Sequence, residues 1–234
     1  MDFSIYQDFA NTKLGVQFDD LNLLVTAFTH RSYVNEHKKT THAHNERLEF
    51  LGDAVLELVV TEFLFTNHED PEGVLTNWRS ALVRTESIGA AAARLEFEPL
   101  LRLSRGEKRG TARARAQILA NAFEAVIGAL YLDQGYEQAK RFIEKNLLIT
   151  FDDILRTGSW MDPKSRLQEV VQSREGHTPQ YKVLDETGPD HEKIFTVGVF
   201  VGNDLRGRGT GPSKQNAQVA AAENALNKIS EQVS

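Results

Sequence analysis

The sequence predicts an all-α domain followed by a small α+β domain in which one helix precedes three strands and a second helix follows them. Up to about residue 155, apolar residues recur at helical spacing. From Tyr181 onward short apolar runs alternate with turn residues, and the clearest strand is Ile194–Val201. We therefore place the first domain at residues 1–156, a linker at 157–161 and the second domain at 162–234.

The first 44 residues predict two helices and a polar loop. Helical spacing from Phe3 ends at Leu14-Gly15, and Asp19 or Asp20 is expected to cap the next helix, which runs to about residue 29. Residues 30–44 are polar and hold four histidines, at a spacing that fits no recognised zinc pattern. We therefore interpret this segment as a mobile loop.

The next helix is expected to begin at Asn45, a good N-cap residue, and to end near Asn67. A step of 100° per residue places its acids on one narrow strip: Glu46, Glu49, Asp53 and Glu57. The rest of the helix is apolar nearly all round, with Leu48, Leu51, Val55, Leu58 and Val59 expected opposite the acids. A solvated helix edge is one explanation. The other is a Mg²⁺ site, because carboxylates beside a core need compensation.

A second apolar helix strengthens the metal hypothesis. Residues 117–130 are apolar nearly throughout, and after Gln117 their only polar groups are Asn121 and Glu124, three residues apart on one face. Ala125, Gly128 and Ala129 would let another helix approach closely. Two buried helices with inward polar pairs are typical of metal sites in helical bundles.

Three more helices complete the expected first domain. They cover residues 75–85, 86–95 and 136–155, and Glu72 falls where the first of them begins. The segment from residue 102 to residue 115 contains six basic residues and one acid, Glu107. This run is therefore either a phosphate contact or a solvated loop. Arg113 and Arg115 lie in that run.

The residues of this chain resemble the ribonuclease III family over nearly its whole length. Residues 45–56, NERLEFLGDAVL, resemble the signature motif of that family almost residue for residue. Residues 27–32 resemble its upstream Thr-His-x-Ser segment, and residues 118–133 resemble its second acidic helix. The C-terminal part resembles a double-stranded-RNA-binding domain.

The resemblance implies an endoribonuclease that hydrolyses double-stranded RNA with two metal ions, Mg²⁺ with Mn²⁺ as a substitute. Its products would carry 5′-phosphate and 3′-hydroxyl ends with short 3′ overhangs, and its targets would be ribosomal and messenger RNA. By resemblance, the catalytic residues are Glu49, Asp53 and Glu124, which with Asn121 form the metal centre. Glu46 and Glu72 match accessory acidic positions of the cleft.

Asn121 is a departure, because the family usually has Asp there. An amide oxygen still coordinates a hard cation, but it is neutral, so we expect weaker metal binding. The alternative is therefore a weakened or inactive double-stranded-RNA-binding protein. A hydrolase of small phosphates is a third reading, but it leaves the C-terminal domain unexplained.

In the family that this chain resembles, each active site cuts one strand, so a cut in both strands of a duplex needs two sites and implies a symmetric homodimer. Phe50 and Leu51 are candidates for its seam, or for the core of one subunit.

The second domain would supply RNA affinity through the minor groove and the phosphates. By resemblance, the minor-groove residues of its first helix are Ser165, Gln168, Glu169 and Gln172. His191 resembles a second minor-groove contact, and Ser213 with Lys214 would present a helix N-terminus and a cation to phosphate. The family usually carries more lysines after that serine, where this chain has Gln215 and Gln218, so the grip on phosphate should be weaker.

Composition bounds the other classes. The chain has no cysteine, which excludes disulfides and thiolate metal sites. It shows no signal peptide and no long apolar run, so we expect a cytoplasmic protein that does not associate with a membrane. We also expect no small-molecule cofactor. Taken alone, the net charge of −6 argues against nucleic-acid binding. The local distribution of charge matters more than this total.

Overall fold

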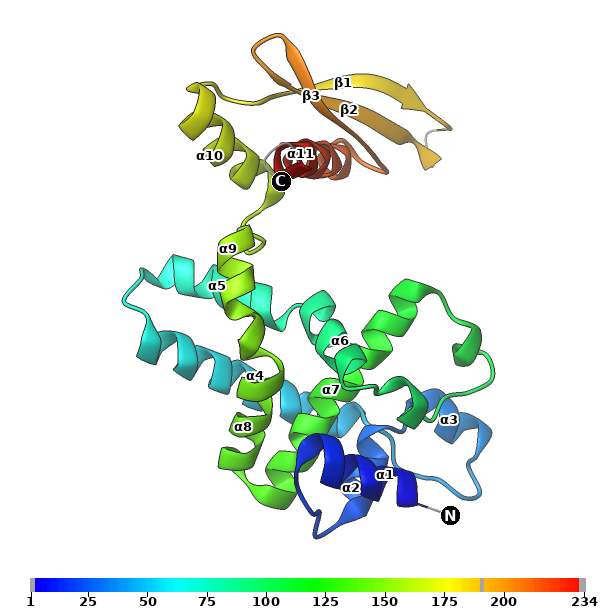
Figure 1. The fold of residues 1–234 in the computed structure, drawn as a ribbon. Helices are drawn as coiled ribbons and strands as arrows, with labels where there is room; N and C mark the ends of the chain where they lie inside the picture. The colour runs from blue at the N-terminus through cyan, green and yellow to red at the C-terminus, as the bar shows by residue number, and fades with distance from the viewer. Residues whose placement is uncertain (1–2, 190–191, 232–234) are drawn as a thin grey trace. The chain divides into compact units, whose positions relative to one another are not determined.

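The computed structural model describes residues 3–189 and 192–231, and Figure 1 shows their fold. The chain divides into two compact units, residues 1–156 and 157–234. The first unit is helical, and the second is a three-stranded sheet with two helices. The predicted fold class, an all-α domain followed by an α-β-β-β-α domain, is confirmed.

The helical unit contains helices of very different lengths. They are α1 (Ser4–Phe9), α2 (Leu21–Ala27), α3 (Arg31–Glu36), α4 (Glu46–Asn67), α5 (Glu72–Val83), α6 (Thr85–Arg94), α7 (Ala112–Gln134), α8 (Tyr136–Asn146) and α9 (Phe151–Thr157). A π-helical turn, Ala10–Leu14, extends α1, and 3-10 turns occupy Glu98–Leu100, Glu107–Arg109 and Leu148–Thr150.

Helices α4 and α7 form the centre of this unit and touch backbone to backbone at two glycines. A Cβ atom built on Gly52 would lie 1.8 Å from the carbonyl oxygen of Glu124. One built on Gly128 would lie 2.2 Å from the carbonyl oxygen of Leu48. No other residue fits at either position, so the expected close approach at the small residues of the second helix is confirmed.

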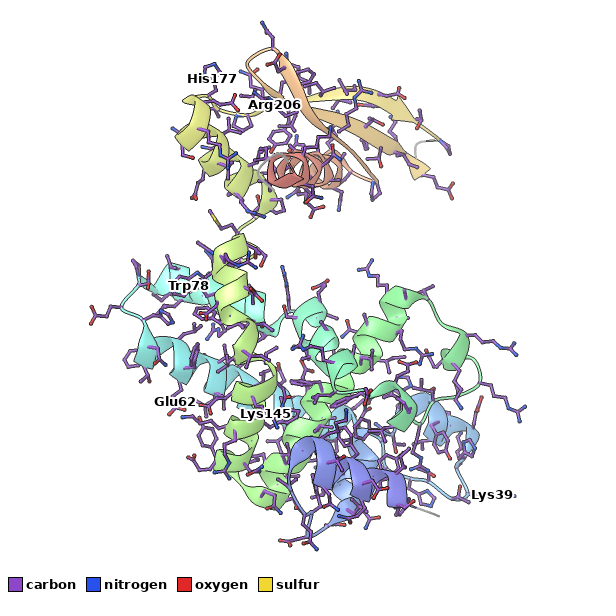
Figure 2. The ribbon with its side chains drawn as sticks, in the orientation of Figure 1. Lys39, Glu62, Trp78, Lys145, His177 and Arg206 are labelled. Carbon is purple, nitrogen blue, oxygen red and sulfur yellow. The ribbon has the colours of Figure 1, made fainter. Side chains whose placement is uncertain are left out.

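Other helices surround this pair. Glu62 of α4, labelled in Figure 2, accepts hydrogen bonds from Tyr136 Oη at 2.6 Å and Lys140 Nζ at 2.9 Å, which tie α8 to α4. Phe28, Phe97 and Phe123 are buried and meet edge to face or tilted, and they join α2 and the segment after α6 to α7.

Two local predictions for this unit were wrong. Residues 30–44 are not a continuous loop, because α3 lies within them. Residues 136–155 are not one helix: after α8, Leu147 and Leu148 turn inward, and Phe151 is buried against Phe63. Asn45 occupies the N-cap position of α4 as predicted, although its side chain makes no capping hydrogen bond. The cap at Asp20 is confirmed, since its side chain accepts from the Asn22 N–H.

The burial of α4 does not follow from its apolar pattern alone. Leu56 and Val60, which flank the acids, are fully buried, whereas Leu58 is exposed. The helix is apolar on more than one side, so the 100° pattern alone does not select the face that enters the core.

The second unit is an antiparallel sheet covered by helices. Its elements are α10 (Pro163–Glu175), β1 (Gln180–Thr187), β2 (Ile194–Val201), β3 (Asp204–Gly211) and α11 (Lys214–Glu231), and the strand order is β1-β2-β3. Val197, Val199 and Val201 alternate along β2 and meet the alanines of α11 in the core. Gly207 and Gly209 of β3 let α11 approach, because a Cβ at Gly209 would lie 2.2 Å from the Ala221 nitrogen.

Across residues 3–189 and 192–231, the structure contains no helix that combines the length and the apolar character of a membrane span.

Candidate metal centre and RNA-binding surface

The crossing of α4 and α7 brings together the three carboxylates that the sequence singles out. Glu49 and Asp53 flank Gly52 on α4, and Glu124 precedes Gly128 on α7. Because these glycines hold the two backbones in contact, Glu124 feels the negative charges of Asp53 and Glu49 directly. Glu49 and Glu124 are half-buried, whereas Asp53 is exposed.

This arrangement shifts the protonation of the carboxyls. Burial raises the pKa of Glu124 to about 7, and the charges of Asp53 and Glu49 add to the increase. Burial also raises the pKa of Glu49, and Glu46 and Asp53 raise it further, while a hydrogen bond from the Asn121 side chain lowers it. The three groups therefore repel one another when ionised.

This donor set fits a divalent cation. A partly buried carboxylate such as Glu49 or Glu124, beside other negative charges, is stabilised by a positive charge nearby, and a hard cation prefers oxygen ligands. Within the described ranges, however, no group of three His, Cys, Asp or Glu side chains lies close enough together to form a finished metal cage. The carboxylates are therefore near enough to influence one another's charge, but in the described residues they do not form a closed ligand set.

Asn121 lies on the same face of α7, and its carboxamide is already engaged. Its Oδ1 accepts a hydrogen bond of 2.7 Å from Gln117 Nε2, one turn earlier on the helix. Gln117 Oε1 in turn accepts from Thr85 Oγ1 on α6 at 3.4 Å. Gln117 was not among the site residues predicted from the sequence, although its spacing of four residues from Asn121 was a signal for this contact.

The two accessory acids have separate surroundings. Glu46 lies 3.6 Å from Arg31 and 3.7 Å from His44. Its negative charge also raises the pKa of the neighbouring Glu49. Glu72 begins α5, accepts from Thr76 Oγ1 at 3.0 Å and lines a hollow of about 440 Å³ between α4 and α5. Their catalytic role stays a prediction.

The basic run from residue 102 is divided between structure and surface. Arg102 packs 4.4 Å over the Tyr33 ring and donates to Thr29 Oγ1 at 3.1 Å, so it fastens α3 rather than facing solvent. Arg115 pairs with Glu98 at 3.2 Å, whereas Arg113 is exposed. Contact of Arg113 and Arg115 with RNA stays a prediction.

Helix α4 also carries a row of exposed apolar side chains. Phe50 is 82% exposed, Leu58 57% and Phe65 80%. Phe50 therefore does not belong to the core of this subunit, which was the alternative that the sequence left open.

The predicted RNA-binding residues of the second unit lie at its surface. Ser165, Gln168, Glu169 and Gln172 are all exposed along α10. Ser165 and Gln168 line a polar hollow of about 390 Å³ together with Gln215 of α11. In the same hollow, Lys164 donates to Gln218 at 2.7 Å.

Ser213 Oγ accepts from the Asn216 N–H at 3.1 Å, which confirms that Ser213 caps α11. Lys214 is exposed at the start of that helix. His191 lies outside the described residues.

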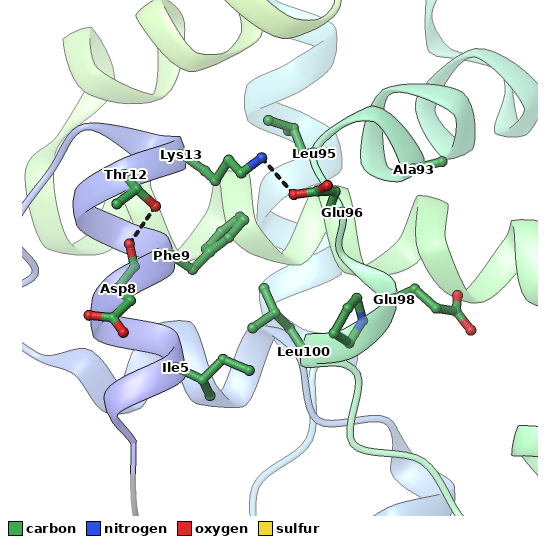
Figure 3. A pocket seen from close by; sticks show the side chains of 11 residues that line it. Ile5, Asp8, Phe9, Thr12, Lys13, Ala93, Leu95, Glu96, Glu98 and Leu100 are labelled. Atoms are coloured by element: carbon green, nitrogen blue, oxygen red, sulfur yellow. Dashed lines mark hydrogen bonds and ion pairs between the residues drawn. The ribbon is translucent and has the colours of Figure 1, made fainter.

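A larger hollow of about 590 Å³ lies between the α1 segment and the segment after α6, and Figure 3 shows its lining. Lys13 and Glu96 pair across it at 2.6 Å. Its lining includes none of the residues predicted for catalysis or RNA binding, so we assign the chemistry to the α4–α7 crossing.

Comparisons with known proteins agree with this geometry. Residues 20–151 match the family model described as ribonuclease-III-like, and residues 163–229 match the double-stranded RNA binding motif. Ribonuclease 3 of Oceanobacillus iheyensis is 46% identical over 220 residues, which cover 92% of this chain and 95% of that protein. Ribonuclease 3 of Enterococcus faecalis is 43% identical, over 93% of this chain and 94% of that protein.

Among solved structures, the nuclease domain of Campylobacter jejuni ribonuclease III matches with a TM-score of 0.53 and 42% identity. The match covers 59% of this chain and 96% of that domain, whose description mentions a flexible region involved in dimer formation.

Proposed function

The chain belongs to the ribonuclease III family, and on that premise we propose that it is an endoribonuclease that hydrolyses phosphodiester bonds in double-stranded RNA. The products carry 5′-phosphate and 3′-hydroxyl ends with short 3′ overhangs. The observation that carries this proposal is the meeting of Glu49, Asp53 and Glu124 where α4 crosses α7.

Family members depend on a divalent metal, and here Glu49, Asp53 and Glu124 would hold it. When bound, a pair of Mg²⁺ ions supplies an activated water and neutralises charge on the phosphate and the leaving oxygen. The protein residues contribute fixed negative charge at a rigid crossing. With a pKa of about 7, Glu124 gives up its proton readily when a cation replaces the proton as the compensating charge.

The second unit holds the duplex in this proposal. The exposed polar side chains of α10 are suited to the 2′-hydroxyls of a minor groove, and the capped start of α11 is suited to phosphate. The unit has nine Lys and Arg against ten Asp and Glu in residues 162–234, so its affinity for RNA should be modest.

We propose a symmetric homodimer as the working form. The related C. jejuni domain is described with a region involved in dimer formation, and α4 of this chain exposes Phe50, Leu58 and Phe65. An exposed apolar row of this kind is typical of a surface that another chain covers. Two copies would place one centre on each strand of the duplex.

The cellular targets we propose are precursors of ribosomal RNA and messenger RNA. A second candidate function is duplex-RNA binding without cleavage. It is favoured by Asn121, whose neutral side chain removes one negative charge from the centre.

The test is cleavage of a long RNA duplex in Mg²⁺ by the full chain, beside Glu124→Gln and Glu144→Gln. Glu144 is an exposed glutamate of α8, so it serves as a matched control. We expect cleavage by the unmodified chain and by Glu144→Gln, and a loss of a hundredfold or more in Glu124→Gln. Retardation of the duplex on a gel without cleavage by any of the three would select the binding-protein alternative.

A further inference from the structure

Residues 27–32, the Thr-His-x-Ser segment, pair with the first residue of the basic run. The two backbones form a parallel bridge between Thr29 and Arg102. The His30 N–H donates to the Arg102 carbonyl at 3.1 Å, and the Arg102 N–H donates to the Phe28 carbonyl at 2.8 Å. Because Phe28 and Thr29 are buried, this pairing fixes Arg102 against the core of the helical unit.

Two side chains of α3 continue this attachment into the basic loop, residues 105–113, which lies next to α3 in Figure 1. Ser32 Oγ accepts from the Ser104 N–H at 3.1 Å. Both carboxylate oxygens of Glu36 accept from the Arg105 N–H at 3.3 Å. Each donor is a backbone N–H, so the direction of these hydrogen bonds does not depend on a rotamer or a tautomer.

The other end of the basic loop is held by α7. The Arg115 guanidinium donates to the Lys108 carbonyl at 3.0 Å and pairs with Glu98 at 3.2 Å. Thr111 Oγ1 accepts from the Ala114 N–H at 3.2 Å and so caps the start of α7. The basic loop is therefore attached on both sides, to α3 and to α7.

The basic loop presents a concentrated positive charge. Glu107 is the only acid among residues 102–115. Among the residues that the structure describes, no acid pairs with any of the four exposed cationic side chains of the loop, which are Arg105, Lys108, Arg109 and Arg113. A phosphate backbone fits such a cluster, because cations that neutralise phosphates release the condensed counterions of the nucleic acid.

We propose that Ser32 and Glu36 are positioning residues that hold the basic loop as a preformed phosphate-binding surface for duplex RNA. The inference rests on the proposed duplex-RNA function, and it assigns a role to α3, which carries none of the proposed metal-binding residues. A loop already held in its binding conformation loses less conformational entropy when it meets the duplex, so the same cations bind RNA more tightly.

The charge of Glu36 and its hydrogen bond have opposite effects on RNA binding. If the charge dominates, removing Glu36 tightens binding, because an acid beside the phosphates is lost. If the hydrogen bond dominates, removing Glu36 weakens binding, because the Arg105 N–H is released. Glu36→Gln removes the charge but keeps an oxygen acceptor, so a comparison of Glu36→Ala with Glu36→Gln separates the two effects.

The experiment measures the affinity of the full chain for a long RNA duplex by fluorescence anisotropy, without divalent metal so that the duplex stays intact. We expect Glu36→Ala to weaken binding about three- to tenfold, the factor that corresponds to one net hydrogen bond. Glu36→Gln should bind as tightly as the unmodified chain or slightly more tightly. Glu144→Ala, which removes an exposed glutamate of α8, is the control and should have no effect.

Ser32 gives an independent test that involves no charge. Ser32→Ala should weaken binding by a similar factor, because the Ser104 N–H loses its acceptor. Ser32→Thr keeps a hydroxyl and should restore binding. In the free protein, hydrogen exchange at residues 104–107 should become faster in both alanine variants, while exchange in α4 and α7 stays unchanged.

A background without two of the cations shows whether the attachment acts through the basic loop. Lys108→Ala combined with Arg109→Ala should weaken binding and reduce its salt-dependence slope by about 2. In that background, Glu36→Ala should have a much smaller effect than in the unmodified chain.

Unchanged or tighter binding by Glu36→Ala or by Ser32→Ala overturns the inference, and so does an equal loss of affinity in Glu36→Gln. An unchanged slope in the Lys108→Ala and Arg109→Ala background also overturns it, because the loop then does not contact phosphate. In each of these cases, cleavage of the duplex in Mg²⁺ by the unmodified chain leaves the proposed function standing. If the unmodified chain neither binds nor cleaves the duplex, the proposed function itself fails.

Discussion

Both units of the protein are built on a glycine contact, and the two contacts differ in what lies beside them. In the helical unit, Gly52 and Gly128 press two helices together, and the proposed metal-binding carboxylates are within four residues of those glycines. In the second unit, Gly207 and Gly209 press β3 against α11. The residues predicted to bind RNA there are exposed on α10 and at the start of α11, outside the contact.

The two functions therefore depend on packing to different degrees. A small shift at the α4–α7 crossing moves the three carboxylates directly, and misplacement by about 1 Å costs roughly a hundredfold in catalysis. A shift at the β3–α11 contact weakens the fold of the second unit but leaves each RNA-contacting side chain in solvent. Catalysis should therefore be more sensitive to its glycines than RNA binding is to its own.

The largest effect is expected for Gly128→Ala. The new Cβ would lie 2.2 Å from the Leu48 carbonyl oxygen, a backbone atom that cannot move alone. We expect unfolding free energy to fall by about 3–5 kcal/mol and duplex-RNA cleavage to fall at least a hundredfold. Chemical denaturation and cleavage assays measure the two quantities.

Gly73→Ala is the matched control in the same unit. Gly73 lies in the first turn of α5, and a Cβ there meets nothing within 4 Å. Alanine favours a helix by about 0.5–1 kcal/mol over glycine, so this variant should be slightly more stable than the unmodified chain. Equal destabilisation by the two changes would contradict the assigned role of the Gly128 contact.

Gly209→Ala is expected to act on the second unit instead. Its Cβ would lie 2.2 Å from the Ala221 nitrogen, and we expect a loss of about 3 kcal/mol in that unit. Hydrogen exchange should show faster opening of β3 and α11, with α4 and α7 unchanged. Affinity for duplex RNA should fall more than the rate of cleavage at saturating RNA.

The raised pKa of Glu124 predicts a pH dependence of stability. Its folded-state pKa is about 7 against an ordinary value of 4.5, so its contribution is fully present below pH 4.5. That contribution is lost as pH rises through about 7. Without metal, Glu124→Gln should therefore melt higher than the unmodified chain at pH 8 and at the same temperature at pH 4. Parallel melting curves across this range would show that Glu124 titrates normally.

The smallest effect is expected for Lys214→Ala. Lys214 is exposed at the start of α11, where it lies 3.3 Å from Glu186 and 5.5 Å over the Phe195 ring. Loss of one phosphate contact should reduce the salt-dependence slope of duplex-RNA binding by about 1. Lys182→Ala is the control, because Lys182 of β1 lies over the Phe200 ring of β2 in a similar way, at 5.1 Å. An equal change in the two slopes would remove Lys214 from the RNA-binding surface.

The fold was predictable to the extent that each element carries its own periodic signal. The long helix from residue 46 to 67 and the strand Ile194–Val201 have strong local patterns, and both were predicted well. The end of α8 at Asn146 was not predictable, because it depends on the packing of Phe151 against Phe63, which is distant in sequence. The exposure of Phe50 was left open, because an apolar pattern does not say whether its partner is the same chain or another.

The candidate site was predictable as a set of residue types but not as an arrangement. The acids of α4 and the polar pair on α7 were visible from sequence. The link from Thr85 through Gln117 to Asn121 was not, because it needs α6 to pack beside α7. The role of Arg102 in fastening α3 likewise depends on a tertiary contact.

The most direct test of the central claim is the thermal stability of the full chain at pH 7.5 with and without Mg²⁺, beside Glu124→Gln. If the α4–α7 crossing is a cation site, Mg²⁺ stabilises the folded chain by mass action and raises its melting temperature. We expect a clear increase for the unmodified chain and little or none for Glu124→Gln. An equal increase in both proteins would place the cation elsewhere and contradict the assignment of the centre.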